Sequence, residues 1–294
     1  MREKKYFIGN QTYLAPPIEP ALYLVSTPIG HLCDISLRAL SILAACDVLV
    51  CEDKRVTKIL LDRYVIRQHM RAYHEHNAKE VGPQLIEELL NGKSLALVSD
   101  AGTPLISDPG YKLVDEARKK GINIIPIPGA SALLAALVAT GLPTDSFFFA
   151  GFLTTKKQQR KQRLEQLCSI PGSLIFYESP HRVKETLVDM AAILGFDRRA
   201  ALCRELTKKF ETVDVSTLGD LAKRYGEEER IRGEIVLVVE EAKKEKLELT
   251  KEAVDALLLE LSRDLSTAKA AAEAMRITGL KKQDLFQRLV QIKK

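Results

Sequence analysis

Two adjacent carboxylates, Glu52 and Asp53, follow an apolar run at residues 47–51, and a cation, Arg55, stands close behind them. A carboxylate at the end of a strand can take the proton of a weakly acidic hydroxyl, and a nearby cation can stabilise the developing alkoxide. The alternative is structural, with Asp53 capping a helix and Glu52 forming an ion pair at its N-terminus. The residues alone leave both interpretations open.

A second polar cluster, His74, Glu75 and His76, follows a short predicted strand at residues 71–73. Because histidine titrates near neutrality, His74 is a further candidate base. A His-x-His pair can also bind a metal, but no third ligand stands at a suitable spacing, and the five cysteines form no C-x-x-C pair. We therefore expect no metal, with ordinary surface polarity as the other interpretation of the histidines.

A loop rich in small residues spans residues 99–110 (SDAGTPLISDPG), between an apolar run at 95–98 and a helical pattern at 111–118. In a parallel sheet, such a loop lies at the carboxyl edge, where these folds bind ligands. It is neither a P-loop nor a G-x-G-x-x-G loop. Its carboxylates, Asp100 and Asp108, without a lysine, suit a ligand that is not phosphate-rich. Asp100 could instead cap the next helix.

Short apolar runs alternate with amphipathic helical patterns from residue 22 onward, which is typical of α/β architecture. The predicted strands of the first half each end at polar or small residues, and they lie at residues 22–25, 47–51, 71–73, 95–98 and 122–127. Loops after parallel strands share one edge, so we expect them to build one site. Further strands are predicted at residues 173–177, 200–203 and 235–239.

Capping residues predict where several helices begin or end. We expect N-caps at Ser36 or Asp34, Ser131, Ser179 with Pro180 after it, Thr217 with Asp220, Thr250 and Ser266, and a C-terminal stop at Gly279. The chain then divides into a loosely ordered, proline-containing arm (1–20), a first α/β lobe (21–135), a second α/β lobe (136–242) and a helical tail module (243–294). Helices of the tail are predicted at residues 251–261, 267–278 and 283–292.

Composition is that of an ordinary soluble enzyme, with 46% hydrophobic and 28% charged residues in 294. No apolar run approaches the roughly 20 residues of a membrane span, and no signal peptide is evident. With cysteines in odd number, this predicts a cytoplasmic protein with reduced thiols. The net charge of +5 is compatible with a nucleic-acid partner. The basic run at residues 156–163 (KKQQRKQR) is either a phosphate contact or a solvated helix face.

The motifs, taken in order, resemble those of the bacterial 16S rRNA cytidine 2′-O-methyltransferases, which are class III (tetrapyrrole-methylase-like) S-adenosylmethionine-dependent enzymes. The matching segments are residues 22–30 (LYLVSTPIG), 52–55 (EDKR), 73–77 (YHEHN), 99–110, 126–132 (PIPGASA), 176–182 (FYESPHR), 204–208 (RELTK) and 232–238 (RGEIVLV). The tail also resembles the small C-terminal module of that family. The chain departs from the family at His31, Lys54 and Thr154, where Asn, Thr and Pro are usual.

The resemblance implies two αβα lobes with S-adenosylmethionine in the cleft between them, a small helical C-terminal module, and a homodimer. It implies cofactor contacts at Ile29, Asp100, Ala101, Gly102, Thr103, Ser131, Ala132, Tyr177, Gly233 and Glu234. The candidate catalytic residues are Glu52, Asp53, Arg55 and His74. In an RNA enzyme the basic residues become phosphate contacts, namely Lys156, Lys157, Arg160, Lys161 and Arg163, together with Arg182, which could line the cleft or pair with Glu178.

The function that this resemblance implies is 2′-O-methylation of a cytidine ribose in the decoding region of 16S rRNA, within the 30S subunit. A small-molecule, tetrapyrrole-type methyltransferase of the same fold is one alternative, and the basic run and helical tail argue against it. A non-catalytic RNA-binding assembly factor is another, and the intact small-residue loops and the Glu52–Asp53 pair argue against that.

Overall fold

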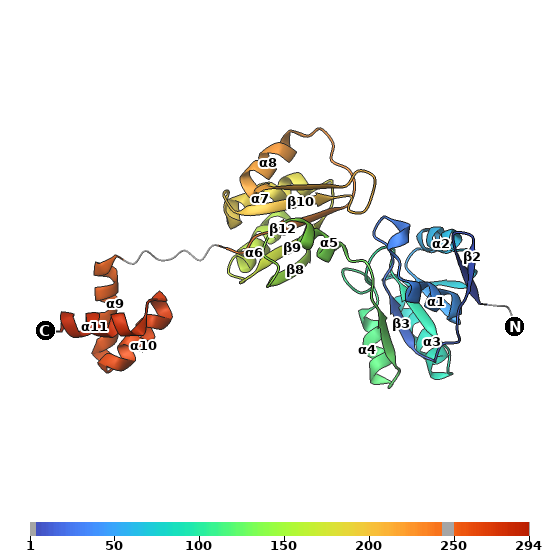
Figure 1. Ribbon diagram of the computed structural model, residues 1–294, viewed down its shortest axis with the longest axis horizontal. Coiled ribbons are helices and arrows are strands. Elements are labelled where there is room, and N and C mark those ends of the chain that lie inside the picture. The colour runs from blue at the N-terminus through green and yellow to red at the C-terminus, as the bar shows by residue number, and fades with distance from the viewer. Residues whose placement is uncertain (1–3, 243–249, 294) are drawn as a thin grey trace. The chain divides into compact units, whose positions relative to one another are not determined.

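The computed structural model describes residues 4–242 and 250–293. It divides into two compact units, Met1–Ala242 and Lys243–Lys294. The first unit holds two α/β lobes, each built on its own five-stranded sheet, and the second unit is helical (Figure 1). The fold class predicted from the sequence is therefore confirmed.

The first lobe is an all-parallel sheet in the order β5-β4-β6-β3-β7. Its strands are β3 (Leu22–Val25), β4 (Val48–Cys51), β5 (Met70–Ala72), β6 (Leu95–Val98) and β7 (Ile124–Ile127). Alternate residues of a strand face opposite sides. Val48 and Val50 thus enter one core, and Leu49 and Cys51 enter the other. Both faces of the sheet are therefore covered, as the continuous apolar runs predict.

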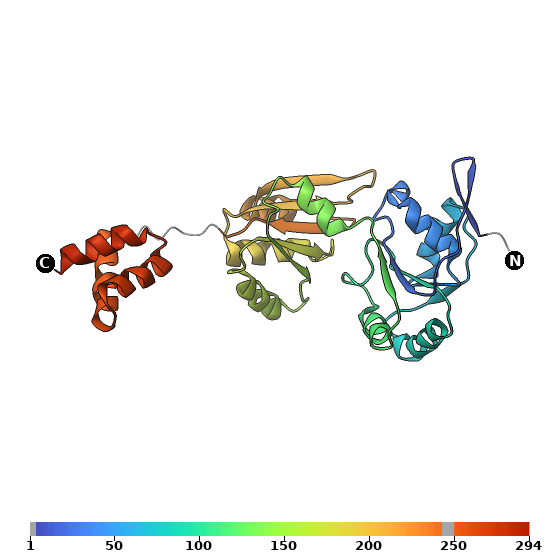
Figure 2. The ribbon, with the colours of Figure 1, turned by 60° about the horizontal axis from the view of Figure 1, so that its bottom comes forward.

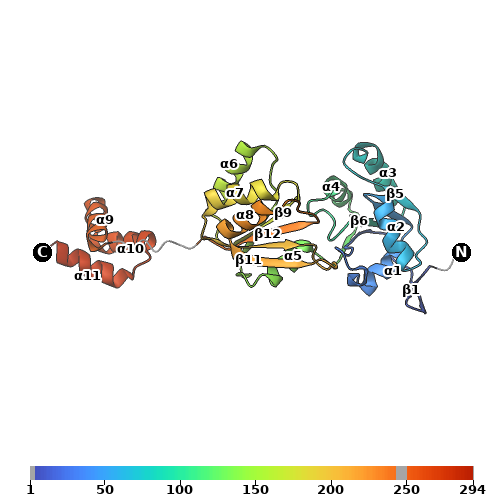
Figure 3. The ribbon, with the colours of Figure 1, turned by 90° about the horizontal axis from the view of Figure 1, so that it is seen from above.

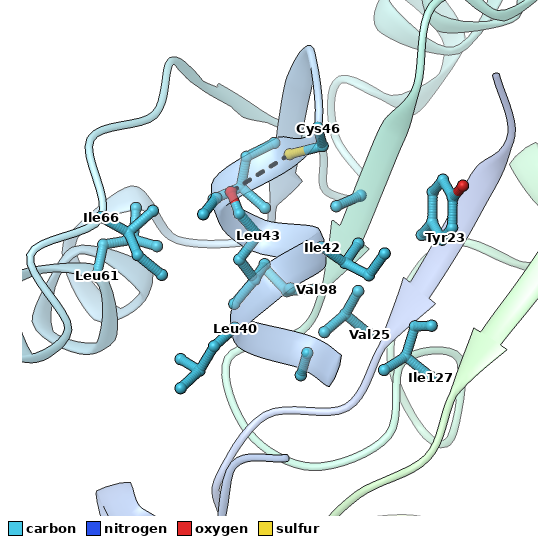
Figure 4. Packing of buried hydrophobic residues seen from close by; sticks show 14 of the residues in the cluster. Tyr23, Val25, Leu40, Ile42, Leu43, Cys46, Leu61, Ile66, Val98 and Ile127 are labelled. Carbon is cyan, nitrogen blue, oxygen red and sulfur yellow. Dashed lines mark hydrogen bonds between the residues drawn. The ribbon is translucent and has the colours of Figure 1, made fainter. Parts of the chain in front are cut away.

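Four helices cover the two faces of this sheet. Residues of α1 (Leu37–Ala45) and α2 (Lys54–Arg63) pack in one core, and residues of α3 (Ala78–Leu90) and α4 (Tyr111–Lys119) pack in the other. Figure 4 shows the first core, in which Leu40 and Leu43 of α1 lie among strand residues such as Val98. A rigid αβα layer of this kind fixes the positions of the loops that leave its carboxyl edge.

The second lobe is a mixed sheet in the order β11-β10-β12-β9-β8. Its strands are β8 (Phe147–Phe152), β9 (Ser173–Glu178), β10 (Arg199–Arg204), β11 (Thr212–Thr217) and β12 (Ile235–Val239), and only β8 and β9 run parallel. Three helices cover one face, α6 (Lys157–Leu167), α7 (Val183–Leu194) and α8 (Leu218–Glu227), while α5 (Ala132–Ala139) lies on the opposite face (Figure 3).

The boundary between the lobes differs from the sequence expectation by a few residues. Helix α5 packs against the second sheet, because Leu133, Ala136 and Leu137 share a core with Ile175 of β9. The chain therefore crosses between lobes just before α5, at residues 128–131, and not near residue 135. From the sequence, the apolar helix α5 could belong to either lobe, because hydrophobic periodicity predicts a helix but does not indicate which sheet it packs against.

The arm at residues 1–20 also differs from the expectation, because its described part is ordered. It forms a hairpin of β1 (Lys5–Ile8) and β2 (Gln11–Leu14), which Figure 2 shows in the darkest blue. Tyr6 is buried, stacks on Tyr13 with ring centroids 5.4 Å apart, and shares a hydrogen bond with Ser41 of α1. The proline cluster that suggested disorder follows the hairpin.

Most predicted caps are confirmed. The side chains of Ser36, Thr217 and Thr250 each accept a backbone N–H of the first helical turn, and Gly279 ends its helix in the left-handed conformation. Ser131 and Ser266 occupy N-cap positions without such a bond. The expectation at Ser179 is wrong, because α7 begins at Val183 after a turn in which Ser179 accepts the N–H of His181.

The second unit packs three helices around a small core of its own. These are α9 (Lys251–Asp264), α10 (Thr267–Thr278) and α11 (Lys282–Ile292), with Leu258, Ala271 and Leu289 at the centre. The sequence analysis ended the first of them three residues early. Among the described helices of the whole chain, none has the length and apolar character needed to cross a membrane.

The core of this unit gives a matched pair of variants. Leu258 is fully buried, and its neighbour Leu259 is 43% exposed. We expect Leu258→Ala to cost the unit about 2–5 kcal/mol, because the truncation leaves a cavity, while Leu259→Ala changes its stability by less than about 1 kcal/mol. Hydrogen exchange of the α9–α11 amides in the full-length protein measures both. Equal protection in the two variants would contradict the assigned packing.

Candidate active site

The loops of the first lobe meet at the carboxyl edge of its sheet, as predicted. Thr27, after β3, and Gly102, after β6, exchange two backbone hydrogen bonds of 2.9 and 3.0 Å. Thr103 Oγ1 then donates to the carbonyl oxygen of Ala130, after β7, at 3.2 Å. Three loops from separate strands are thus tied into one surface.

Gly102 is required at its position for two reasons. Its φ of +80° lies in the left-handed region, which favours glycine. A Cβ there would also lie 3.4 Å from Ile29 Cγ2. The backbone bridge to Thr27 therefore forms at a residue whose φ favours glycine.

A cavity of about 370 Å³ lies between the two lobes of the first unit, and we call it the interlobe cavity. Every residue to which the sequence analysis assigned a cofactor contact lines it, namely Ile29, Asp100, Ala101, Gly102, Thr103, Ser131, Ala132, Tyr177, Gly233 and Glu234. Its volume and its mainly small and apolar lining, with a few polar groups, are typical of a small-molecule site.

Several lining residues were missed by sequence reasoning. They are Ile106, Ser107, Phe152, Ser179, Pro180, Leu206, Ile235 and Val236, while Asp108 lines the cavity as a carboxylate of the loop that was expected to bind a ligand. Glu178 also lines the cavity, as the cleft-lining interpretation of the Glu178–Arg182 pair allowed. Most of the missed residues stand inside motifs that the sequence analysis had already singled out. Motif membership was the available signal, but it does not say which side chains of a motif point into the cavity.

The second lobe closes the cavity with aromatic side chains. Tyr177 makes edge contacts with Phe149 and Phe152, whose ring centroids lie 4.8 and 5.6 Å away. Burial raises the pKa of the Tyr177 phenol, so the ring stays neutral at physiological pH. Tyr177 and Phe152 thus give this side of the cavity an aromatic lining.

An ion cluster holds the wall at Gly233 and Glu234. The Glu205 carboxylate accepts the backbone N–H of Glu234 at 3.0 Å and the Lys208 ammonium at 2.9 Å, and these bonds hold the pKa of Glu205 below its usual value. A Cβ at Gly233, where φ is +93°, would lie 2.5 Å from Glu205 Cγ. Glycine is therefore needed for the loop to approach this carboxylate.

A polar hollow adjoins the interlobe cavity, and we call it the acidic hollow. It is lined by Glu52, His74, Glu75, His76, Ser107, Asp108 and Pro109. Burial raises the pKa of Glu52, and the charges of Asp100, Asp108, Glu75 and Asp53 raise it further. No ion pair of Glu52 occurs among the described residues, so the ion-pair alternative for this carboxylate is not observed.

Asp53 has the capping role that the sequence analysis kept open. Its carboxylate accepts the N–H of Arg55 at 2.8 Å and the Arg55 guanidinium at 2.6 Å. These bonds lower the pKa of Asp53 to about 2. Such a carboxylate is a weak base at neutral pH, so the capping interpretation accounts for Asp53. Its backbone N–H donates to Asp100 Oδ1 at 3.0 Å, which links the α2 N-terminus to the cavity loop.

His74 lies at the boundary between the acidic hollow and a further opening lined by Glu52, Asp53, Lys54, Ala72 and Asp100. Its Nδ1 is buried without a hydrogen-bond partner, and its ring makes an edge contact with His76 at 5.9 Å. Across the described ranges 4–242 and 250–293, no group of three or more His, Cys, Asp or Glu side chains is arranged to hold a metal ion.

Arg160, predicted to contact RNA, is buried inside the second lobe. Its guanidinium lies 2.7 Å from Asp189 Oδ2 and 3.3 Å from Glu185 Oε2, and only 1% of the side chain is exposed. A cation so enclosed cannot reach a phosphate, so the prediction for Arg160 is wrong. Lys156 and Lys157 are exposed, and Lys161 and Arg163 are partly exposed. In a helix that packs on a sheet, some residues of a basic run face the protein core. The basic run by itself does not indicate which of its residues are buried.

Arg182 also has a structural role instead of the predicted RNA contact. It pairs with buried Glu178 at 2.7 Å and donates to the Leu153 carbonyl at 3.0 Å. Glu178 accepts further bonds from Ser179 N and Thr186 Oγ1, both at 2.6 Å. The ion pair of Glu178 and Arg182 is therefore observed together with the cavity lining by Glu178, and it stabilises that part of the wall.

A family model described as tetrapyrrole (corrin/porphyrin) methylases matches residues 21–222, which is more than half of the chain. The chain belongs to this family. A second model, the RsmI C-terminal HTH domain, matches residues 248–293 and so covers the helical unit. The resemblance inferred from the motifs is thereby confirmed.

Two curated relatives extend the match over most of the chain. A protein named ribosomal RNA small subunit methyltransferase I from Mesorhizobium japonicum is 54% identical over 286 residues, which is 97% of each chain. Its namesake from Halalkalibacterium halodurans is 50% identical over 231 residues, 79% of each. Among solved structures, uroporphyrin-III C-methyltransferase from Thermus thermophilus, 16% identical with a TM-score of 0.54, matches 76% of this chain and 98% of its own, and shares the fold.

The buried ion pair between Arg160 of α6 and Asp189 of α7 predicts that Arg160 contributes to the stability of this tetrapyrrole methylase family member. We expect Arg160→Met to cost about 3 kcal/mol, because it leaves the buried Asp189 carboxylate with only the longer contact to Lys161, at 3.7 Å. Lys157→Met, on the exposed side of the same helix, should change stability by less than about 0.5 kcal/mol. Urea unfolding measures both, and equal unfolding midpoints would contradict this assignment.

Proposed function

We propose that the protein transfers a methyl group from S-adenosylmethionine to the 2′-hydroxyl of a cytidine in small-subunit rRNA. The observation that carries this proposal is the interlobe cavity, because it gathers every expected cofactor residue and opens beside a cluster of carboxylates. The relatives that match most of the chain are named as small-subunit rRNA methyltransferases, which supports the substrate class.

The cavity fits the proposed cofactor. Its ≈ 370 Å³ suits a ligand of this size, and Gly102 and Gly233 keep two of its walls free of side chains. We propose that Asp100–Thr103, Ser131, Ala132 and Tyr177 hold the cofactor, consistent with the solved relative that is described as complexed with S-adenyl homocysteine. When bound, S-adenosylmethionine supplies a methyl group on a sulfonium that leaves as a neutral thioether.

The protein's own contribution is then alignment, exclusion of water and removal of one proton. The Tyr177 wall keeps water from one side of the cavity, and the loop bridged at Gly102 fixes the other. The hydroxyl enters from the acidic hollow, where carboxylates can accept its proton. Arg55 is engaged by Asp53, so its proposed role is to hold the α2 N-terminus beside Glu52.

We propose further that the substrate is rRNA within the 30S subunit, which places the protein in the cytoplasm. Lys156 and Lys157 remain candidates for phosphate contacts, with Lys161 and Arg163 beside them. The helical unit matched as an HTH domain is a further candidate for contact with the subunit.

A homodimer is also proposed, and α5 supports it. This helix carries no polar side chain between Ala132 and Ala139, yet Leu134 and Val138 are 48% and 72% exposed. In the described part of the first unit, α5 is the helix that packs on the face of the second sheet opposite α6, α7 and α8. Exposed apolar side chains on a nonpolar helix are typical of a surface that pairs with another copy.

The substrate proposal is tested with cofactor carrying a labelled methyl group, incubated separately with naked 16S rRNA, 30S subunits and a precorrin. We expect label in 2′-O-methylcytidine from the subunits. Label on the precorrin would favour the small-molecule alternative, and RNA binding without any label would favour a non-catalytic assembly factor. Either result contradicts the proposal.

The cofactor half is tested with Gly102→Leu against Gly121→Leu. Both glycines have positive φ, +80° and +73°, so both variants bear similar backbone strain. Only the first adds a side chain to the cavity wall, since nothing lies within 4 Å of a Cβ at Gly121. We expect more than about tenfold weaker binding of S-adenosylhomocysteine for Gly102→Leu by calorimetry, equivalent to about 1.4 kcal/mol. Similar affinities in the two variants would contradict the site.

A further inference from the structure

Asp108 stands where the interlobe cavity and the acidic hollow meet. It lines both spaces, together with its neighbour Ser107. These two residues are therefore shared by the wall of the cavity and the wall of the hollow. Of the titratable residues that line the cavity, Asp108 is the one that also lines the hollow, within the described part of the chain.

The other candidate bases line only one of these two spaces or are engaged. Glu52 and His74 line the hollow but not the interlobe cavity. Asp53 is held by Arg55. Asp100 lines the cavity but not the acidic hollow, and its Oδ1 accepts the backbone N–H of Asp53.

We propose that Asp108 is the general base that removes the proton from the substrate hydroxyl, an inference that rests on the proposed function. As the ribose oxygen forms its bond to the methyl carbon, the bond from that carbon to sulfur breaks, and its electron pair stays on sulfur. The hydroxyl proton passes to the Asp108 carboxylate and then to water through the open hollow. Glu52 lines the acidic hollow but not the interlobe cavity, and there it acts as a positioning residue for the ribose.

The surroundings of Asp108 make it a stronger base than an ordinary aspartate. Burial raises the pKa of its carboxyl and the charge of Asp100 raises it further, while a side-chain hydrogen bond from Ser99 opposes both. The other ionisable groups that share its two spaces are Glu52, His74, Glu75, His76, Tyr177, Glu178 and Glu234, and none of them carries a fixed positive charge.

The backbone around Asp108 is held in an unusual conformation. Leu105 and Ser107 both lie in the left-handed region, with φ of 72° and 64°, which costs energy for residues other than glycine. Gly110 has a φ of +132°, and a Cβ there would lie 3.2 Å from Leu97 Cδ2. A Cβ at Gly151 of the second lobe would lie 3.6 Å from Ser107 Oγ. The turn thus lies against both lobes, and backbone strain of this kind is common at functional sites.

The test compares Asp108→Asn with Asp115→Asn, a matched change on exposed α4 outside both spaces. We expect Asp108→Asn to lower the single-turnover methylation rate about 10²–10⁴-fold, and Asp108→Glu to recover part of it. The wild-type rate should fall as pH drops through the carboxyl pKa, and the Asn variant should lack this acid limb. Asp115→Asn should keep both the rate and the limb.

Measuring the affinity for S-adenosylhomocysteine distinguishes a general base from a cofactor contact at Asp108. Asp108→Asn should bind S-adenosylhomocysteine within about twofold of wild type and unfold at the same temperature. Lost cofactor binding would instead make Asp108 a cofactor contact, and an unchanged rate, or a larger loss in Glu52→Gln, would also overturn the proposal. If the wild type binds the cofactor but leaves rRNA unmethylated, the proposed function itself fails, which the labelling experiment reports independently.

Discussion

The pair of backbone hydrogen bonds between Thr27 and Gly102 is the constraint on which the site depends. It ties loops from two strands together at the edge of a rigid parallel sheet, and Thr103 extends the tie to the crossing segment at Ala130. The crossing segment leads directly into α5 and so into the second lobe. The Thr27–Gly102 bridge therefore helps to position the wall of the cavity that the first lobe forms against the wall that the second lobe forms.

The site also concentrates negative charge. Besides burial, the charges of Asp100 and Asp108 raise the pKa of Glu52, and the charge of Asp100 raises the pKa of Asp108. Like charges in proximity oppose folding, so their retention points to function more than to stability. Two of the nearby cations are engaged by other carboxylates, Arg55 by Asp53 and Lys208 by Glu205 and Glu234. A proton acceptor and a sulfonium ligand are both favoured by such a field.

Local patterns predicted most of the fold, and the resemblance to the family supplied the expected cofactor residues, which all line the interlobe cavity. The apolar residues of β4 and the small residues of the loop at 99–110 are contiguous in the sequence. The buried strand and the ligand-binding loop could therefore be predicted from these segments alone. Features set by tertiary packing could not. Arg160 reads as a surface cation until Asp189 is seen opposite it, and α5 reads as part of the first lobe until its contacts with β9 are known. Asp108 was visible as a polar residue of its loop, but its place between two spaces depends on β4, β5 and the second lobe together.

The most direct test of this account is a crystal structure of the protein with a non-reactive analogue of S-adenosylmethionine and a cytidine-containing rRNA fragment. The account predicts the analogue in the interlobe cavity against Gly102 and Tyr177, with the ribose 2′ oxygen within hydrogen-bond distance of Asp108 and in line with the position of the transferred methyl group. An analogue bound outside this cavity, or a 2′ oxygen that faces another side chain with Asp108 turned away, would contradict it.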